Sequence, residues 1–406
     1  MDRTKTQETF QLLVGGKEAF PKIIRCIREA KKSIRIRMFI WRDDKIGNRL
    51  AAELLAAAER GVKITIVKDR YGSVCEYSEE SGRSFFHTFP ALSDRLRANV
   101  LKAGYHPELL KKGFSKEIPD KAWALLSHPN VEIHHTEMLC DHSKFYLFDD
   151  EILIFGGINV EDKEIWQDMR GMAYLDYMVA VHSKQIASQF QALLKDPKGA
   201  DDALFARNDP KLGYYGIKPR MLKLIGEAQK ELVIVMPYFS VYPEFAKVIR
   251  DAAGRGVKIT VVLPKAANFY DDSNKKTMQV WLRGAPGLQI RLSAAMVHAK
   301  AVMSEHEITI GSCNLNRRSL DSLGELNVFF KQDSVPPSGD AASYERFWNG
   351  VREKILQVAN EAEPASATTL DYNGAVSFLE SFSYYAENLP ALLKKACGRR
   401  ERLKTD

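Results

Sequence analysis

The sequence contains two copies of one short pattern, and this repetition predicts a fold built from two similar halves. The first copy spans residues 142–159 and the second spans residues 298–314. Each copy has a histidine and a lysine two positions apart, so on an extended strand both side chains point to the same side. An acid, an apolar strand, a glycine turn and an asparagine follow in both copies. The shared polar residues are His142, Lys144 and Asn159 in the first copy, and His298, Lys300 and Asn314 in the second.

The segments before the two copies also repeat. Residues 17–41 and 217–240 each predict an amphipathic helix followed by an alternating apolar strand. Further helices are expected at Leu50–Ala58 and Phe245–Ala253, and each ends at a glycine. The strands that follow, Arg60–Val67 and Arg255–Val262, are nearly identical in sequence. Short strands that alternate with helices predict an α/β protein with layered sheets.

The first half is longer than the second. Gly61 and His142 are 81 positions apart, whereas Gly256 and His298 are 42 positions apart. The extra residues fall mostly in the segment 75–128, which we interpret as an insertion. Long insertions near a site often select the substrate. A helical lid without substrate contact is an equally good interpretation.

Turn-rich stretches suggest where the units begin and end. We expect a first half at 1–195, a connection at 196–216, a second half at 217–360, and a linker with a C-terminal amphipathic and basic segment at 361–406. The last segment has apolar residues at helical spacing, which favour packing on the protein itself over a membrane contact. They are Tyr372, Val376, Leu379, Phe382, Ala386 and Leu389.

The doubled pattern resembles the phospholipase D superfamily, whose members carry two His-x-Lys-x4-Asp motifs. The second copy continues as Gly311-Ser312-Cys313-Asn314, then Arg317-Arg318-Ser319 and Glu325-Leu326-Asn327. This continuation is most similar to the bacterial cardiolipin synthase and phosphatidyltransferase branch. The resemblance covers residues 8–330. It implies two α/β/α sandwich halves related by a pseudo-twofold axis, with a single active site at their interface.

Phosphodiesters are anionic and resist attack. An enzyme that cleaves them without a metal therefore supplies a nucleophile, a proton donor for the leaving oxygen and positive charge around the phosphoryl group. The resemblance implies that His142 is the nucleophile and His298 the general acid, although the two roles could be exchanged. Lys144 and Lys300 would supply the charge, and Asn159 and Asn314 would complete the expected catalytic set.

Other residues are assigned by matched positions in the family motifs. Glu325 is expected to orient His142, and Asp176 is expected to orient His298, with Asp168 as the alternative to Asp176. A further set is expected to bind the phosphoryl group through backbone N–H groups, a hydroxyl and an amide. These substrate-binding residues are Gly157, Ser312 and Asn316.

The sequence departs from the family pattern in three places. Glu305 stands where the second motif has Asp, a position that is usually structural. Gly157 stands where the second copy has Ser312, so the first copy lacks that hydroxyl. A third His-x-Lys begins at His182, but no acid or Gly-x-x-Asn follows it, and we interpret it as a strand end without a catalytic role.

No metal or cofactor is expected. A zinc cluster of His134, His135, Cys140, Asp141 and His142 has no equivalent in the second half, so zinc is disfavoured. The five cysteines are widely spaced and odd in number, which is typical of a reducing compartment. The polar start has no signal-peptide pattern, and no apolar run reaches the length of a membrane span. These features favour a cytoplasmic protein associated peripherally with the membrane.

Three functions are compatible with the sequence. The first is a phosphatidyl transferase acting on phosphatidylglycerol or a similar phospholipid. The second is a nuclease or non-lipid phosphodiesterase, because the net charge of +7 would also attract nucleic acid, the less favoured partner. The third is a non-catalytic lipid-binding module. Oligomeric state stays open. A lipid enzyme needs an apolar entrance beside its charged site. Phe85, Phe86, Phe89 and Leu92, together with the C-terminal apolar residues, are candidates for it, and a place in the core is an equally good interpretation of these residues.

Overall fold

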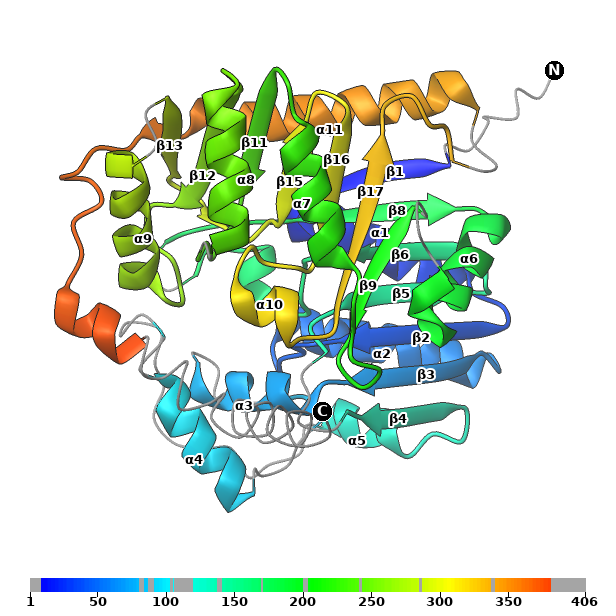
Figure 1. The fold of residues 1–406 in the computed structure, drawn as a ribbon. Helices are drawn as coiled ribbons and strands as arrows, with labels where there is room; N and C mark the ends of the chain where they lie inside the picture. Colours follow the sequence, from blue (N-terminus) through cyan, green and yellow to red (C-terminus); the bar gives the residue numbers. More distant parts are fainter. Residues whose placement is uncertain are drawn as a thin grey trace, which may run out of the picture.

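The computed structural model consists of two sheets that lie face to face, with helices on the outside (Figure 1). Within the part of the chain described here, no helix combines the length and the apolar character needed to cross a bilayer. The residues described are 9–79, 84–86, 91–102, 105, 120–136, 141–168, 171–199, 204–240, 243–284, 287–336 and 340–380.

The first sheet has seven strands in the described residues. In order across the sheet they are β1 (Phe10–Val14), β8 (Tyr177–His182), β6 (Ile152–Gly156), β5 (Lys144–Phe148), β2 (Ser33–Met38), β3 (Lys63–Lys68) and β4 (Val131–His135). Strands β2, β3 and β4 are parallel, whereas β5, β6, β8 and β1 pair in antiparallel fashion. The helices α1 (Gly15–Glu29) and α2 (Lys45–Glu59) pack on the outer face.

The second sheet repeats this arrangement. Its nine described strands are β10 (Tyr214–Tyr215), β9 (Phe205–Asp209), β17 (Glu325–Lys331), β16 (Glu307–Gly311), β15 (Ala301–Ser304), β11 (Glu231–Val235), β12 (Lys258–Pro264), β13 (Leu288–Ser293) and β18 (Glu363–Pro364). The order β17-β16-β15-β11-β12-β13 matches β8-β6-β5-β2-β3-β4 strand for strand. Helices α7 (Ile217–Glu227) and α8 (Pro243–Gly254) cover the outer face as α1 and α2 do in the first half. The predicted α/β class and two-half organisation are confirmed.

The near-identical Arg-Gly-Val-Lys segments make the same contacts in both halves. Arg60 Nη2 donates to carbonyl oxygens at the end of α1, at 2.9 and 3.1 Å, and Arg255 Nη2 donates to those at the end of α7, at 2.8 and 2.9 Å. Gly61 and Gly256 have φ values of +92° and +85°, a conformation that favours glycine. Each arginine thus satisfies helix-end carbonyls that have no partner within their helix.

The acids of the two motifs are structural in both halves. Asp149 accepts backbone N–H groups of residues 31–33 at 2.7–2.9 Å, and Glu305 accepts those of residues 229–231 at 2.7–3.3 Å. Both carboxylates therefore hold the turn between the first helix and first central strand of their half. The replacement of Asp by Glu305 preserves this contact.

The main shared core lies between the two sheets. Alternation along β5 points Phe145 and Leu147 toward the second sheet, while Tyr146 and Phe148 pack in the first-half core with α1. Residues of β15, β16 and β17 complete the layer from the other side, and α6 (Lys184–Lys195) and α11 (Ala341–Glu361) border it. Each half thus uses the other half to cover the inner face of its sheet.

The insertion contributes the helices α3 (Arg70–Ser78), α4 (Leu92–Leu101) and α5 (Asp120–Leu126). The expectation that Phe85 and Phe86 border an apolar entrance is wrong. Both rings are buried, and their centroids lie 5.9 and 5.1 Å from that of Trp41, within the first-half core. Leu92 is exposed as the entrance would require, and Phe89 lies outside the described residues.

Two stretches expected to be linkers hold strands of the second sheet. Residues 196–216 contain β9 and β10, and β18 pairs with β13 before the chain reaches the buried Leu370. Residues 374–380 are helical as the apolar spacing predicted, with Leu379 exposed. Phe382, Ala386 and Leu389 lie outside the described residues. The division of the chain at 195 and 217 stays a prediction.

Because the sheets share one core, we predict that Phe155→Ala destabilises both halves together. The Phe155 ring is fully buried, and its centroid lies 5.4 Å from that of Phe205 on the second sheet. Loss of this ring should lower the free energy of unfolding by about 3–5 kcal/mol in a single urea transition. The matched control is Leu212→Ala, at an exposed position, which should change it by less than about 0.5 kcal/mol. Two separate transitions would contradict a shared core.

Candidate active site

Each motif histidine stands directly before a central strand and is held by backbone of the opposite half. His142 precedes β5, and its N–H donates to the carbonyl oxygen of Gly324 at 2.7 Å. His298 precedes β15, and its N–H donates to the carbonyl oxygen of Leu175 at 2.7 Å. The second contact extends the short parallel pair of β7 (Tyr174–Leu175) and β14 (Met296–Val297). Each histidine therefore occupies its position only when the two halves are packed together.

The imidazole rings are oriented by carboxylates, and these also come from the opposite half. His142 Nδ1 lies 3.1 Å from Glu325 Oε2, and His298 Nδ1 lies 2.8 Å from Asp176 Oδ2. These are the pairs that the motif positions predicted. The alternative residue, Asp168, instead accepts a backbone N–H from Met172 in a turn at 3.0 Å. With Nδ1 engaged in both rings, Nε2 is the atom available for chemistry.

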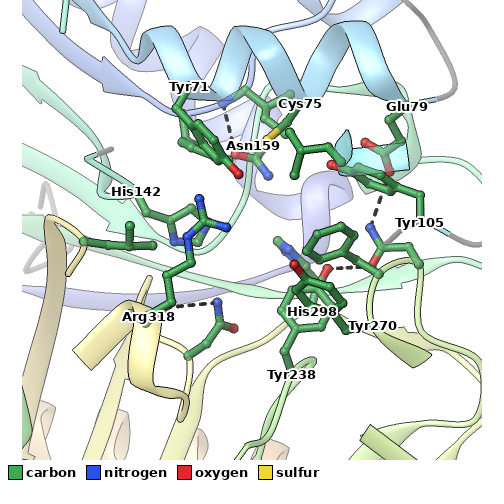
Figure 2. Close-up of a pocket in the computed structure, with 18 of the residues that line it drawn as sticks. Tyr71, Cys75, Glu79, Tyr105, His142, Asn159, Tyr238, Tyr270, His298 and Arg318 are labelled. Carbon is green, nitrogen blue, oxygen red and sulfur yellow. Dashed lines mark hydrogen bonds between the residues drawn. The ribbon is translucent and has the colours of Figure 1, made fainter. Parts of the chain in front are cut away.

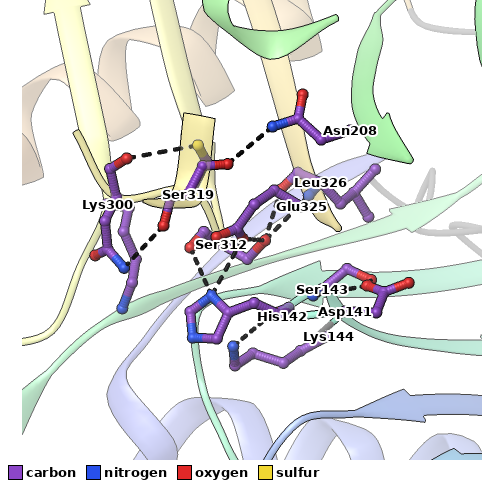
Figure 3. A network of polar contacts seen from close by, with 12 residues as sticks. Asp141, His142, Ser143, Lys144, Asn208, Lys300, Ser312, Ser319, Glu325 and Leu326 are labelled. Atoms are coloured by element: carbon purple, nitrogen blue, oxygen red, sulfur yellow. Dashed lines mark hydrogen bonds and ion pairs between the residues drawn. The ribbon is translucent and has the colours of Figure 1, made fainter. Parts of the chain in front are cut away.

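The carboxylates are supported differently in the two halves. Ser312 Oγ donates to Glu325 Oε2 at 2.5 Å, and Leu326 N donates to Ser312 Oγ at 3.0 Å (Figure 3). At the matching position, Gly157 leaves space for Asp176, because a Cβ atom there would stand 2.3 Å from Asp176 Oδ1. Neither Ser312 nor Gly157 lines the cavity described below. Their expected role as phosphoryl-binding residues is therefore corrected to support of the carboxylates behind the histidines.

The motif lysines are fully buried beside the histidines. Lys144 Nζ donates to the carbonyl oxygen of His142 at 2.6 Å, and Lys300 Nζ donates to that of His298. Lys300 Nζ also lies 3.7 Å from Asp176. The two ammonium groups place fixed positive charge at the centre of the site, where the low dielectric increases its effect.

Burial and these charges set the protonation of the histidines. Burial, reinforced by Lys144, lowers the pKa of His142 below its ordinary value despite the opposing effect of Glu325. Burial followed by Lys300 lowers the pKa of His298 well below its ordinary value. Burial also raises the pKa of Asp176 to about 6. At neutral pH both imidazole rings are therefore uncharged, as the ring of a nucleophilic histidine must be.

Both histidines line one cavity, which has a volume of about 110 Å³ (Figure 2). The predicted Asn159, Asn314 and Asn316 also line it. Asn159 accepts the backbone N–H of Ile40, and Asn316 Oδ1 caps the short helix α10 (Arg317–Asp321) by accepting from Ser319 N at 2.9 Å. Asn314 Oδ1 is buried and has no partner among the described residues, so it is suited to a ligand.

The two ends of the cavity differ in character. Near His142 the wall is formed by Phe39, Tyr71 and Arg318, whose guanidinium lies 4.5 Å from the Tyr71 ring centre (Figure 2). The centroid of Phe39 is 4.6 Å from that of His142. Arg318 lies in the segment that carries the family resemblance, but it was assigned no role from the sequence, although its place after Asn316 was the available signal.

Near His298 the wall is polar and aromatic. Tyr238 Oη donates to Asn268 Oδ1 at 2.5 Å, and Asn268 Nδ2 donates to Glu79 at 3.4 Å. Tyr174 also lines this end, and its hydroxyl has no partner among the described residues. Sequence patterns did not single out these residues, which come from separate loops. Glu79, Leu101 and Tyr105 from the insertion line the cavity, which favours the interpretation that the insertion contributes to substrate selection.

The charged groups behind this polar wall neutralise one another. Glu79 Oε1 accepts from Lys163 Nζ at 2.7 Å, and Arg42 Nε donates to Glu161 at 2.8 Å. Burial alone would raise the pKa of Glu79, but Lys163 and Arg42 outweigh it and keep the carboxylate ionised. Two carboxylates face two cations, so this end of the cavity offers hydroxyls and amides with little net charge.

One buried acid near the site was not found from the sequence. Glu164 Oε1 accepts the Asn159 N–H at 3.2 Å and lies 4.0 Å from His298 Nδ1. Burial and the neighbouring Asp176 raise the pKa of Glu164 well above its ordinary value. Glu164, Asp176 and His298 are the one ligand-type group that clusters within 4.8 Å among the described residues. Lys300 already provides positive charge to this cluster.

The other histidines within the described residues do not line the cavity. His182 ends β8, with Nε2 3.2 Å from Glu151 Oε1, which agrees with the interpretation of the third motif as a strand end. His134 and His135 lie exposed on the edge strand β4. Cys140 lies outside the described residues.

Several known proteins are similar to this chain in sequence. The sequence profile of a family described as "Cardiolipin synthase, PLD-like domain" matches residues 23–196 and 221–344. Cardiolipin synthase B of Shigella flexneri is 26% identical over 356 residues, which cover 78% of this chain and 75% of that protein. A cardiolipin synthase of Listeria welshimeri is 24% identical over 348 residues, covering 80% of this chain and 66% of that protein.

Two solved structures share the fold at low sequence identity. A phosphatidylserine synthase of Haemophilus influenzae aligns with a TM-score of 0.66 at 15% identity and covers 96% of this chain and 95% of that chain. A polyphosphate kinase of Porphyromonas gingivalis aligns with a TM-score of 0.53 at 12% identity, covering 92% of this chain and 53% of that chain.

The close packing of Gly157 against Asp176 leads to a prediction. Gly157→Ala should displace the carboxylate from His298, because the added Cβ would stand 2.3 Å from Asp176 Oδ1. We expect a loss of about 1–3 kcal/mol in the free energy of unfolding and a change in the ¹⁵N chemical shifts of the His298 ring. Gly226→Ala is the matched control, since a Cβ there meets no atom within 4 Å. An unchanged His298 spectrum would contradict the proposed role of Gly157.

The lowered pKa of His142 predicts a specific dependence of stability on pH. Unfolded His142 takes up a proton near pH 6.5 and the folded form resists it, so stability is lost as pH falls below 6.5. His142→Gln should reduce the difference in unfolding free energy between about pH 7.5 and about pH 5.5, by up to about 1 kcal/mol. His306→Gln, at an exposed position, is the control. An equal effect of both substitutions would contradict the assignment.

Proposed function

This chain belongs to the family described as cardiolipin synthase, PLD-like domain, and we propose that it transfers a phosphatidyl group between alcohols through a phosphohistidine. Phospholipids are the substrate class, in keeping with the names of its relatives. Phosphatidylglycerol or a similar anionic phospholipid is the proposed donor, presented at a membrane surface. The observation that carries the proposal is the pair of neutral histidines from opposite halves that line one cavity.

In the first step the Nε2 lone pair of His142 attacks phosphorus. A P–N bond forms, the P–O bond to the head alcohol breaks, and the leaving oxygen takes a proton from Nε2 of His298. In the second step His298 accepts the proton of an incoming alcohol, whose oxygen attacks phosphorus. The P–N bond then breaks and His142 returns to its starting form. Hydrolysis follows when water takes the place of the alcohol.

Bound substrate would provide the charge that this sequence of steps needs. A phosphodiester anion between the two rings favours a protonated imidazole, so it raises the pKa of His298 from its low value in the empty site. Lys144, Lys300 and Arg318 would stabilise the added negative charge of the transition state. Glu325 and Asp176 would hold the rings in one tautomer.

The asymmetry of the cavity supports the assignment of the two roles. The polar end beside His298 suits the head alcohol, whose oxygen must receive a proton when it leaves. The apolar ring of Phe39 lies beside His142, and Leu101 and Leu323 also line the cavity; these side chains suit the glycerol backbone and the first acyl carbons. These apolar groups favour a lipid over a nucleic acid.

Turnover of defined substrates tests the proposal. Wild-type protein in chelator should release the head alcohol from phosphatidylglycerol vesicles and form a new phosphatidyl ester when a second alcohol is added. His142→Ala and His298→Ala should each reduce the rate by at least about 10³-fold, whereas His306→Ala, at an exposed position, should leave it unchanged.

Parallel incubation with single-stranded DNA distinguishes the alternatives. Cleavage of DNA without turnover of lipid would establish the nuclease instead. Vesicle binding without turnover of either substrate, and with no effect of His142→Ala, would establish a lipid-binding module. Either result would contradict the proposed transferase.

A further inference from the structure

The helix α4 of the insertion has an apolar face that no described residue covers. Leu92, Leu96 and Val100 are spaced four residues apart, and their side chains are 71%, 60% and 39% exposed. Residues at this spacing lie in one row along a helix. Exposed leucines in a row are unusual on a soluble surface and typically mark an interaction site.

The opposite face of the same helix forms part of the wall of the active cavity. Ala98 and Leu101 are buried against Tyr71 and Val74 of α3. Leu101 lines the cavity together with Tyr105, which follows the helix. The exposed row is therefore separated from the active cavity by the thickness of one helix.

A second exposed apolar group is attached to the other half of the cavity wall. Residues 374–380 are helical, and Phe378 and Leu379 are 68% and 51% exposed. Glu380 fixes this helix by accepting the backbone N–H of Ser273 at 2.8 Å. Ser273 lies in the first turn of α9 (Asp271–Gly284), which follows directly after Tyr270, a residue that lines the cavity. Both apolar groups thus lie on segments that bound the same opening.

The charges on α4 identify the kind of partner. Its one acid, Asp94, is paired with Arg70 at 3.1 Å and is largely buried. The other charged residues of the helix, Arg95 and Arg97, stand on either side of Leu96, and Arg97 is exposed. Leucines interleaved with arginines are typical of helices that lie in the interface of an anionic bilayer. A protein partner would not require basic residues on both sides of Leu96.

We propose that the exposed faces of α4 and of residues 374–380 dock this protein on an anionic bilayer. The reason for docking rests on the proposed function, because a lipid substrate would keep its acyl chains in the bilayer while its phosphodiester enters the cavity. Docking through α4 would hold the cavity opening at the membrane surface. The leucines would enter the acyl region, and the arginines would contact the phosphate groups of the lipid.

Vesicle sedimentation tests the docking surface with the full chain. Wild-type protein should bind phosphatidylglycerol vesicles more tightly than phosphatidylcholine vesicles, and Leu92→Glu/Leu96→Glu should reduce binding to phosphatidylglycerol vesicles at least about tenfold. Val280→Glu is the matched control, because Val280 is 66% exposed on α9 and belongs to neither group. Equal binding by the double variant and the wild type would overturn the proposal.

Two further measurements separate docking from folding and from catalysis. Leu96→Trp keeps the face apolar, and its fluorescence should shift to the blue with phosphatidylglycerol vesicles; the absence of a shift would overturn the proposal. The glutamate variant should retain turnover of a short-chain, water-soluble phosphatidylglycerol, so loss on that substrate also counts against a pure docking role. His142→Ala should bind vesicles normally, which distinguishes failure of the proposed function from failure of docking.

The oligomeric state tests whether a second copy of this chain covers the apolar face instead. If the wild type is a dimer and Leu92→Glu/Leu96→Glu is a monomer with unchanged vesicle binding, the face belongs to a second copy and the docking proposal is overturned.

Discussion

The site depends on the exchange of carboxylates between the two halves. His142 of the first half is oriented by Glu325 of the second, and His298 of the second is oriented by Asp176 of the first. Each contact includes a buried carboxylate, and burial of that carboxylate without its histidine partner would cost free energy. The shared core between the sheets brings these groups together, and the site is therefore a property of the packed pair rather than of either repeat.

Burial of the site also sets the protonation of its two histidines. Burial and the two lysines lower the pKa values of both histidines, so the site holds neutral imidazoles beside fixed positive charge. An anionic phosphodiester is the ligand that this arrangement favours, because it balances the lysines and restores a protonated histidine. The two cavity ends differ, with Phe39 and Arg318 beside His142 and hydroxyls and amides beside His298, and this difference would give a nearly symmetric scaffold an asymmetric reaction.

Much of this could be predicted from the sequence because the motifs are local and duplicated. The strand that follows each His-x-Lys and the two glycine turns follow from the local pattern, and the candidate histidine–carboxylate pairs follow from positions matched to the family motifs. The roles of Gly157 and Ser312 could not be predicted from the sequence, because they depend on how the carboxylates of Asp176 and Glu325 pack beside the histidine rings. The polar wall at Tyr238 and Asn268 and the burial of Phe85 depend on contacts between distant loops, which no local pattern records.

The central claim is that two histidines from different halves act on one phosphorus atom. A crystal structure with vanadate, which imitates the pentacovalent phosphoryl group, tests it most directly. The account predicts vanadium bonded to Nε2 of one histidine, with Nε2 of the other within hydrogen-bonding distance of an apical vanadate oxygen. Vanadate held by one histidine, with the other turned away from it, would contradict the account.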